Sequence, residues 1–184
     1  MLTDDVKTIE PLPGPLSGSC VVPGDKSISH RAVLFSAMAE GASRLSGVLD
    51  SSDVRASIDA VRKLGAEVTL EKQPDGSLSG GVVGWGAKGP KQPDGPIYCA
   101  NSGTTARLLM GILAPWDIEV KITGDESLSR RPMRRITAPL MKMGVSFDPA
   151  GAETLPIVER GTRDLRAISY DSPMASAQLK TAVL

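Results

Sequence analysis

The chain has 184 residues, of which 41% are hydrophobic and only 3% aromatic, and its 21 basic side chains balance its 21 acidic ones. A chain of this length can fold as one ordinary domain that buries roughly 70% of its unfolded surface, and the core must be mainly aliphatic. The zero net charge argues against nucleic-acid or membrane-surface binding driven by bulk charge.

The cysteine and histidine content excludes several kinds of site. Cys20 and Cys99 have neither the spacing of metal ligands nor the number that a disulfide framework needs. His30 is the only histidine, so we expect no zinc site and no Ser-His-Asp triad. No apolar run approaches the ~20 residues of a membrane span, and residues 1–11 lack a signal-peptide core. We expect a soluble α/β protein of a reducing compartment, the cytoplasm.

The first predicted helix starts in the run Pro23-Gly24-Asp25-Lys26-Ser27-Ile28-Ser29-His30-Arg31 and continues to Ala39. Backbone N–H groups at a helix start lack intrahelical partners and lie at the positive end of the helix dipole, so they attract anions. Lys26 adds a mobile positive charge, Arg31 a planar fork for a carboxylate or phosphate, and Ser27 a hydroxyl. The run therefore predicts recognition of a small molecule with several negative charges.

A strand and a second helix follow in this first repeat. Residues 44–48 have a strand pattern, residues 53–64 have apolar side chains at helical spacing, and residues 66–70 alternate like a strand. The stretch 74–96 is rich in glycine, proline, lysine and aspartate, which indicates a hairpin and a loop.

A second repeat has the same order of elements. We predict a strand at 97–100, a helix from Ser102-Gly103-Thr104-Thr105 to Leu113, a strand at 118–122, a helix over 133–143 and a strand at 145–147. Arg31 and Arg107 are equivalent positions, 76 residues apart. Helical spacing also predicts that Met38, Met110, Met133 and Met143 belong to the core.

A third repeat begins near Leu155 and reaches an apolar helix that opens on Ser176-Ala177-Gln178. The sequence stops there without a capping glycine, a following strand or a second helix. An apolar helix face without a partner is unfavourable, so we expect the chain to be the first part of a longer protein.

Five motifs, in this order, resemble the 5-enolpyruvylshikimate-3-phosphate synthase family, and the resemblance covers nearly all of the chain from Val21 onward. The motifs are Gly24–Arg31, Leu49–Arg55, Asn101–Arg107, Gly124–Met133 and Ser176–Gln178. The Ser-Ala-Gln triplet and the Arg-Pro-Met sequence at 131–133 are similar to the mainly bacterial second class of the family.

The resemblance implies that the intact enzyme transfers the enolpyruvyl group of phosphoenolpyruvate to the 5-hydroxyl of shikimate 3-phosphate and releases phosphate, without a metal or cofactor. The residues implied for shikimate 3-phosphate are Lys26, Ser27, Arg31, Ser176, Ala177 and Gln178. Those implied for phosphoenolpyruvate are Lys26, Asn101, Gly103, Arg131 and Gln178. No catalytic acid or base is assigned, because the family's catalytic carboxylates lie in its second half. Gly103 carries no methyl group that would obstruct the inhibitor glyphosate.

The family fold implies two similar domains, each of three βαβαββ units around a pseudo-threefold axis, with the active site between them. Residues 1–20 would lead from the other domain, 21–90 and 91–154 would form two units, and 155–184 would begin a third. The expected partners are small anionic substrates and the missing C-terminal half, with neither nucleic acid nor membrane. The intact enzyme is expected to be a monomer.

We interpret the other charged residues of these motifs as structural rather than functional. We interpret Arg130, Arg134 and Arg135 as a solvated helix face, and His30 as a local hydrogen-bonding residue. Asp53 and Arg55 are interpreted as a helix cap and first-turn residue. Two other functions stay open: the sister enolpyruvyl transferase that acts on UDP-N-acetylglucosamine, and a non-catalytic anion-binding module.

Overall fold

Asp and Ser residues determine where most of the helices begin. The structure is a computed structural model that describes residues 7–8, 10–11, 14–151, 153–172 and 175–184. The capping side chains are those of Asp25, Ser51, Ser102, Asp125 and Ser176, and each accepts a hydrogen bond from the backbone N–H three residues later. The α-helices are α1 (Lys26–Met38), α2 (Ser52–Lys63), α3 (Gly103–Leu113), α4 (Glu126–Ser129), α5 (Arg134–Lys142) and α6 (Ala177–Val183).

The strands form two sheets with the same internal order. The strands are β1 (Ala42–Val48), β2 (Glu67–Lys72), β3 (Leu78–Val83), β4 (Ile97–Tyr98), β5 (Glu119–Thr123), β6 (Ser146–Asp148) and β7 (Ile157–Arg160). The first sheet has the order β1-β3-β2, and the second has the order β4-β5-β7-β6. In each sheet the last strand in sequence, β3 or β7, lies antiparallel between two earlier ones. Only β4 breaks the correspondence, because it adds a parallel strand beside β5.

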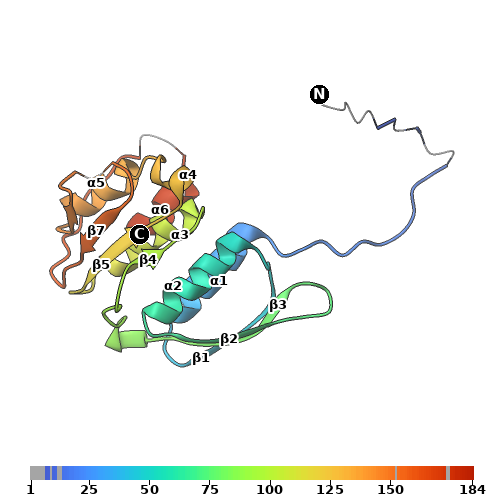
Figure 1. Cartoon of the computed structure of the whole chain (residues 1–184), viewed down its shortest axis with the longest axis horizontal. Helices are drawn as coiled ribbons and strands as arrows, with labels where there is room; N and C mark the ends of the chain where they lie inside the picture. The colour runs from blue at the N-terminus through green and yellow to red at the C-terminus, as the bar shows by residue number, and fades with distance from the viewer. Residues whose placement is uncertain (1–6, 9, 12–13, 152, 173–174) are drawn as a thin grey trace.

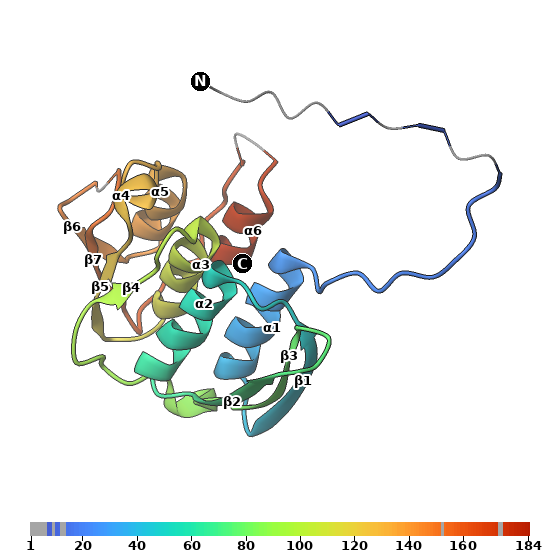
Figure 2. The same ribbon diagram turned by 45° about the vertical axis from the view of Figure 1, so that its right-hand side comes forward.

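The helices pack between and beside these sheets (Figures 1 and 2). α1 and α2 cover the first sheet, and α3 contacts α1 and α2 as well as α5 and α6. The buried apolar side chains of both halves form one connected core, which is mainly aliphatic as the composition predicts. The helix starts that carry the sequence motifs are therefore brought together through packing around α3.

The predicted core methionines divide into two groups. Met110 and Met133 are fully buried and Met143 packs against the core, as predicted. The prediction for Met38 is wrong, because this side chain is 41% exposed. It lies on a face of α1 that also exposes Ile28 and Phe35, at helical spacings of three and seven residues.

Most predicted elements are confirmed, and the differences involve short segments. The strand predicted at 97–100 is regular only over Ile97–Tyr98, and α4 was not predicted. The sequence analysis placed residues 157–160 in the third unit, but as β7 they pair between β5 and β6 in the second sheet. Residues 14–20 extend away from the sheets (Figure 1), whereas Gly24 lies against the backbone of Gly47 in β1; none of residues 14–25 joins a strand. Within the described parts of the chain, no helix has the length and hydropathy needed to cross a bilayer.

Candidate functional site

The start of α1 carries Lys26, whose ammonium group is held by the first turn of α2. Its Nζ atom lies 3.0 Å from Oδ2 of Asp53. The cap of α2 is Ser51, so the interpretation of Asp53 as a cap is wrong, and its carboxylate instead neutralises Lys26. Arg55 pairs with both carboxylate oxygens of Asp50, which lowers the pKa of that carboxyl group. α1 and α2 are thus tied together at their N-terminal ends.

Arg31 extends from α1 to α6, which lies about 150 residues later in the sequence. Its Nη2 atom donates to Oγ1 of Thr181 at 3.0 Å and to the backbone oxygen of Ala177 at 3.4 Å. Its Nη1 atom donates to the backbone oxygen of Ser27 at 3.1 Å. Together these elements line an open pocket of about 540 Å³, which we call the α1/α6 pocket. Its lining residues are Ser27, Arg31, Thr104, Ser176, Ala177, Gln178, Lys180 and Thr181.

Gln178 connects this pocket to the start of α3. Its Nε2 atom donates to Oγ1 of Thr104 at 2.9 Å, and its Oε1 atom accepts from Nη1 of Arg107 at 3.1 Å. An amide can donate and accept at once, so one side chain bridges two helices.

Arg107 is a functional candidate that the sequence analysis did not name. The residue is 5% exposed, and its Nη2 atom donates to the backbone oxygen of Pro132 at 3.2 Å. Burial, and then the charges of Arg135 and Arg131, lower the pKa of Arg107 to about 10, so it stays protonated at neutral pH. Its equivalence to Arg31 in the second repeat was the signal that could have identified it.

Arg131 and Asn101 form the other side of the α3 start. Arg131 donates from Nη2 to the side-chain oxygen of Asn101 and from Nη1 to its backbone oxygen at 3.3 Å. Asn101 in turn donates to Oδ2 of Asp125 at 2.8 Å. Backbone donation by Leu128, and then the Asn101 amide, lower the pKa of Asp125, so it is a carboxylate at neutral pH. This chain of contacts fixes the guanidinium of Arg131 beside the start of α3.

Gly103 lies against both guanidinium groups. A Cβ atom at this position would be 2.6 Å from Nη1 of Arg107 and 3.6 Å from Nη1 of Arg131. Any side chain here would therefore displace Arg107, and glycine lets this guanidinium lie directly against the backbone at the helix start.

The structure brings most of the predicted site residues together in two adjacent groups. Ser27, Arg31 and Ser176–Gln178 line the α1/α6 pocket, whereas Asn101, Gly103 and Arg131 lie on the α3 side of Gln178. Lys26 pairs with Asp53 and does not line the α1/α6 pocket. Besides Arg107, the sequence analysis missed Asp53, Thr104 and Thr181 as neighbours of the site. Their partners lie 27 to 150 residues away, and no local pattern indicates such contacts.

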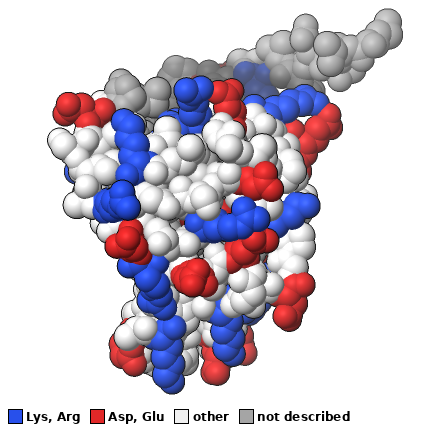
Figure 3. Space-filling view, turned by 90° about the vertical axis from the view of Figure 1, so that its left-hand side faces the viewer, with Lys and Arg blue, Asp and Glu red and all other residues white. Residues whose placement is uncertain are grey.

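The interpretation of the other arginines is partly confirmed. Arg130 pairs with Glu126 and Arg134 with Glu153 at exposed positions. Arg135 is only half-exposed and its charge acts on Arg107, so it does not belong to a solvated face. Figure 3 shows positive and negative side chains interspersed over one face of the molecule, in keeping with the zero net charge.

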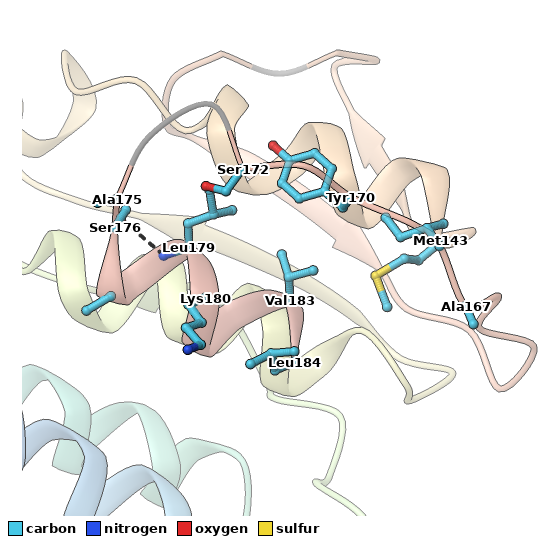
Figure 4. Close-up of a pocket in the computed structure, with 12 residues that line it drawn as sticks. Met143, Ala167, Tyr170, Ser172, Ala175, Ser176, Leu179, Lys180, Val183 and Leu184 are labelled. Carbon is cyan, nitrogen blue, oxygen red and sulfur yellow. Dashed lines mark hydrogen bonds between the residues drawn. The ribbon is translucent and has the colours of Figure 1, made fainter.

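Three other features of the described residues do not suggest an anion-binding site: the potential metal ligands, Cys99 and a second cavity. No cluster of three potential metal-ligating side chains occurs among them. Cys99 is buried, and burial raises the pKa of its thiol to about 12, so it is not a nucleophile at neutral pH. A larger cavity of about 820 Å³ lies along α6, where apolar side chains such as Leu179, Val183 and Met143 line it (Figure 4).

Comparisons with known proteins agree with the geometry. A family model described as EPSP synthase (3-phosphoshikimate 1-carboxyvinyltransferase) matches residues 11–184. The chain is 49% identical over 177 residues to the 3-phosphoshikimate 1-carboxyvinyltransferase of Parvibaculum lavamentivorans, covering 96% of the chain and 38% of that protein. Over 170 residues it is 48% identical to the enzyme of the same name from Streptococcus equi subsp. equi, covering 92% of the chain and 39% of that enzyme.

A solved structure of EPSP synthase from Acinetobacter baumannii is also similar. It superposes with a TM-score of 0.81 at 42% identity, over 91% of this chain and 37% of that one. The chain therefore has the α/β fold of this structure over the part that is shared. It spans well under half of the length of the curated relatives that it matches.

Proposed function

The chain belongs to the EPSP synthase family, and we propose that the full-length protein transfers the enolpyruvyl group of phosphoenolpyruvate to the 5-hydroxyl of shikimate 3-phosphate, with release of phosphate. One observation carries this proposal: Gln178 joins the α1/α6 pocket to the arginine cluster at the α3 start. Two adjacent cationic groups bridged by one amide suit a reaction between two phosphorylated substrates.

Shikimate 3-phosphate is assigned to the α1/α6 pocket. Ser27, Arg31 and Ser176–Gln178 line it, and Lys26 stands beside it at the start of α1. The guanidinium of Arg31 is already fixed by Thr181 and Ala177, so little side-chain entropy is lost when it binds a phosphate. The hydroxyls of Ser27 and Ser176 supply neutral hydrogen-bonding groups to the same ligand.

Phosphoenolpyruvate is assigned to the α3 start. Asn101, Gly103 and Arg131 would hold it, with Gln178 and Lys26 reaching it from the shikimate 3-phosphate side. Arg107 adds a buried positive charge to the partly exposed one of Arg131 beside Gly103, which favours a trianionic ligand over a neutral one.

The chemistry requires proton transfers that these residues do not supply. The 5-hydroxyl oxygen attacks C2 of phosphoenolpyruvate while the methylene carbon gains a proton and a base takes the hydroxyl proton. The tetrahedral adduct then loses phosphate and a methyl proton, which restores the double bond. The cationic side chains of Lys26, Arg31 and Arg131 stabilise negative charge, whereas the acid and base are assigned to the rest of the protein.

The repeated topology supports an assignment of units within one domain. Two groups of strands with the same order, β1-β3-β2 and β5-β7-β6, are compatible with βαβαββ units around a pseudo-threefold axis. The pairing of β7 with β5 and β6 supports a second unit that ends beyond Arg160 rather than at residue 154. The remaining residues, with α6, would begin a third unit, and residues 1–20 would lead from a second domain. We assign the full-length protein to the cytoplasm as a monomer.

Ligand binding and turnover test the proposal separately. We expect shikimate 3-phosphate to raise the melting temperature of the 184-residue chain, and UDP-N-acetylglucosamine to leave it unchanged. Only shikimate 3-phosphate has a size that fits the α1/α6 pocket and a negative charge that complements Arg31 there. We expect the chain alone to release no phosphate from the two substrates and the full-length protein to do so. A shift with the UDP-sugar alone would favour the sister transferase. Binding without turnover by the full-length protein would favour an anion-binding module.

A further inference from the structure

A buried chain of hydrogen bonds joins the starts of α1, α2 and α3. The Nδ1 atom of His30 on α1 lies 2.8 Å from Oγ of Ser57 on α2, and that oxygen lies 2.7 Å from Oγ1 of Thr105 on α3. Thr105 donates at 2.7 Å to Oγ of Ser102, the cap of α3. His30, Ser57 and Thr105 have no exposed surface, and Ser102 is 1% exposed. We call these four residues the buried polar chain.

The buried polar chain restricts the relative positions of the three helices to a smaller range than apolar packing does. A buried hydroxyl group that loses its partner is left with its full desolvation cost, and the geometry of a hydrogen bond holds only over a few tenths of an ångström. The neighbouring helix positions carry small apolar residues such as Ala56, Ala60 and Ala106, which would tolerate a small sliding movement. The register of α1, α2 and α3 at their N-terminal ends is therefore set by these polar contacts.

The buried polar chain lies directly behind the candidate site. His30 precedes Arg31 in α1, and Thr105 follows Thr104, the partner of Gln178. Oγ1 of Thr105 also lies 3.4 Å from the backbone oxygen of Asp53, whose carboxylate holds Lys26. His30, Thr105 and Ser102 are thus within one helical turn of a residue assigned to a substrate, and Ser57 is one turn from Asp53, which holds Lys26.

The burial of His30 indicates the direction of proton donation. Burial lowers the pKa of His30 to about 4, so the ring is neutral at pH 7 and carries one proton. Its Nε2 atom is buried and has no hydrogen-bond partner among the described residues. A proton on Nδ1 leaves Nε2 as an unpaired acceptor, which is less costly than a buried N–H without an acceptor. Donation then runs from His30 through Ser57 and Thr105 to Ser102.

We propose that the buried polar chain is a positioning network that holds the α3 start, with Gly103, at a fixed distance from the α1 start, with Lys26 and Arg31. The inference rests on the proposed function, in which the two helix starts hold two substrates that must react with each other. A displacement on the order of 1 Å between reacting groups costs up to a hundredfold in rate, so this distance matters for turnover. The four residues touch neither substrate and act through the helices that they join.

Kinetics of Thr105 variants in the full-length protein test the positioning role. Thr105→Val removes the hydroxyl and keeps the shape, and we expect kcat/KM for phosphoenolpyruvate to fall by about tenfold, as the loss of one buried hydrogen bond implies. The KM for shikimate 3-phosphate should change less than about twofold, because the α1/α6 pocket keeps its own contacts. Thr105→Ser retains the hydroxyl and should restore kcat/KM. Ser57→Ala gives the same test at a second position if Thr105→Val does not fold.

Ser36→Ala is the matched control for loss of stability. Ser36 is another buried hydroxyl of α1, 8% exposed, at the opposite end of the helix from the site. We expect this variant to lower the melting temperature without changing kcat/KM. Equal kinetics for Thr105→Val and Thr105→Ser in an active enzyme would overturn the positioning role alone. An inactive wild-type full-length protein would overturn the proposed function and this inference with it.

A spectroscopic measurement tests the direction of donation. Nitrogen-15 chemical shifts of the His30 ring distinguish protonation at Nδ1 from protonation at Nε2, and this chain has no other histidine. We expect protonation at Nδ1 in the wild-type chain and a mixture of tautomers in Ser57→Ala. A ring protonated at Nε2 in the wild type would overturn the proposed direction.

Discussion

The two halves of the molecule share a strand order but differ in the partners that their polar side chains have. In the half with β1, β2 and β3, the buried His30 has a partner in Ser57, and Lys26 is neutralised by Asp53. In the half with β4 to β7, Arg107 donates to the neutral oxygens of Gln178 and Pro132, and neither carboxylate oxygen of Glu159 has a hydrogen-bond partner among the described residues.

Glu159 occupies the middle of the second sheet. It lies on β7 between Val120 of β5 and Phe147 of β6, and it faces the same side as the buried Ile157. Burial raises its pKa well above the ordinary value, because removal from water favours the neutral acid over the carboxylate. The comparison shows that equivalent topology does not require equivalent cores: His30 has a hydrogen-bonded neighbour on one ring nitrogen, whereas neither carboxylate oxygen of Glu159 has one among the described residues.

The largest expected effect is on the pH dependence of stability, in which the two buried groups oppose each other. The pKa of His30 is about 4 in the folded chain and about 6.5 when unfolded, so the unfolded chain binds more protons between these values and stability rises with pH there. For Glu159, with its raised pKa, stability falls as pH rises above about 4. The two slopes therefore partly cancel in the wild type.

Substitution of either His30 or Glu159 should reveal the pH dependence that the other residue contributes to stability. We expect the free energy of unfolding of Glu159→Gln to rise by about 3 kcal/mol between pH 4 and pH 6.5, because the opposing term is gone. In His30→Gln it should fall over the same range. Urea titrations at several pH values measure both slopes. Parallel pH profiles for the two variants would contradict the opposite treatment of the two groups.

Substitution of Arg107 tests the role of the buried positive charge in the second half, which donates to the neutral oxygens of Gln178 and Pro132. We expect Arg107→Met to lower the affinity of the full-length protein for phosphoenolpyruvate by roughly thirtyfold, because a buried charge-assisted contact of about 2 kcal/mol is lost. Isothermal titration calorimetry gives the affinity. Arg130→Met is the matched control, since Arg130 is exposed and pairs with Glu126. Equal affinities of the two variants would show that Arg107 is structural only.

Replacing Glu159 by a residue of similar volume should make the two sheets more alike. We expect Glu159→Val to increase the free energy of unfolding at pH 8 by about 1.5 kcal/mol, because an unpaired polar group becomes an apolar one in a strand. Val158→Thr on the other face of the same strand is a control for substitution in β7. A lower stability of Glu159→Val in urea unfolding would mean that the carboxyl group has a partner outside the described residues.

Gly103 gives the smallest of these expected effects. In Gly103→Ala, the new methyl group would lie 2.6 Å from Nη1 of Arg107, which must move. We expect the inhibition constant of the full-length protein for glyphosate to rise by about tenfold, a cost of about 1.4 kcal/mol for the displaced guanidinium. An unchanged inhibition constant would show that the inhibitor does not occupy the space beside Gly103.

Local signals in the sequence predicted most of the elements and fewer of the contacts. The caps Asp25, Ser51 and Ser102 and the glycines that follow α1, α2 and α5 are detectable because capping acts over three residues. β7 was not predicted, since a four-residue strand with a buried Glu159 lacks an alternating apolar pattern. Met38 was placed in the core because helical spacing reports an apolar face but not what covers it.

The sequence by itself determined which residues carry charge at the helix starts and where those helices begin. Only the tertiary structure decided that Arg31 meets Thr181, that Gln178 joins Thr104 to Arg107, and that Glu159 is buried with no hydrogen-bond partner in the described part of the chain. The physical reason is one of range. Capping and periodicity act between residues up to four apart, whereas these contacts depend on the order of strands in two sheets and on helix packing around α3.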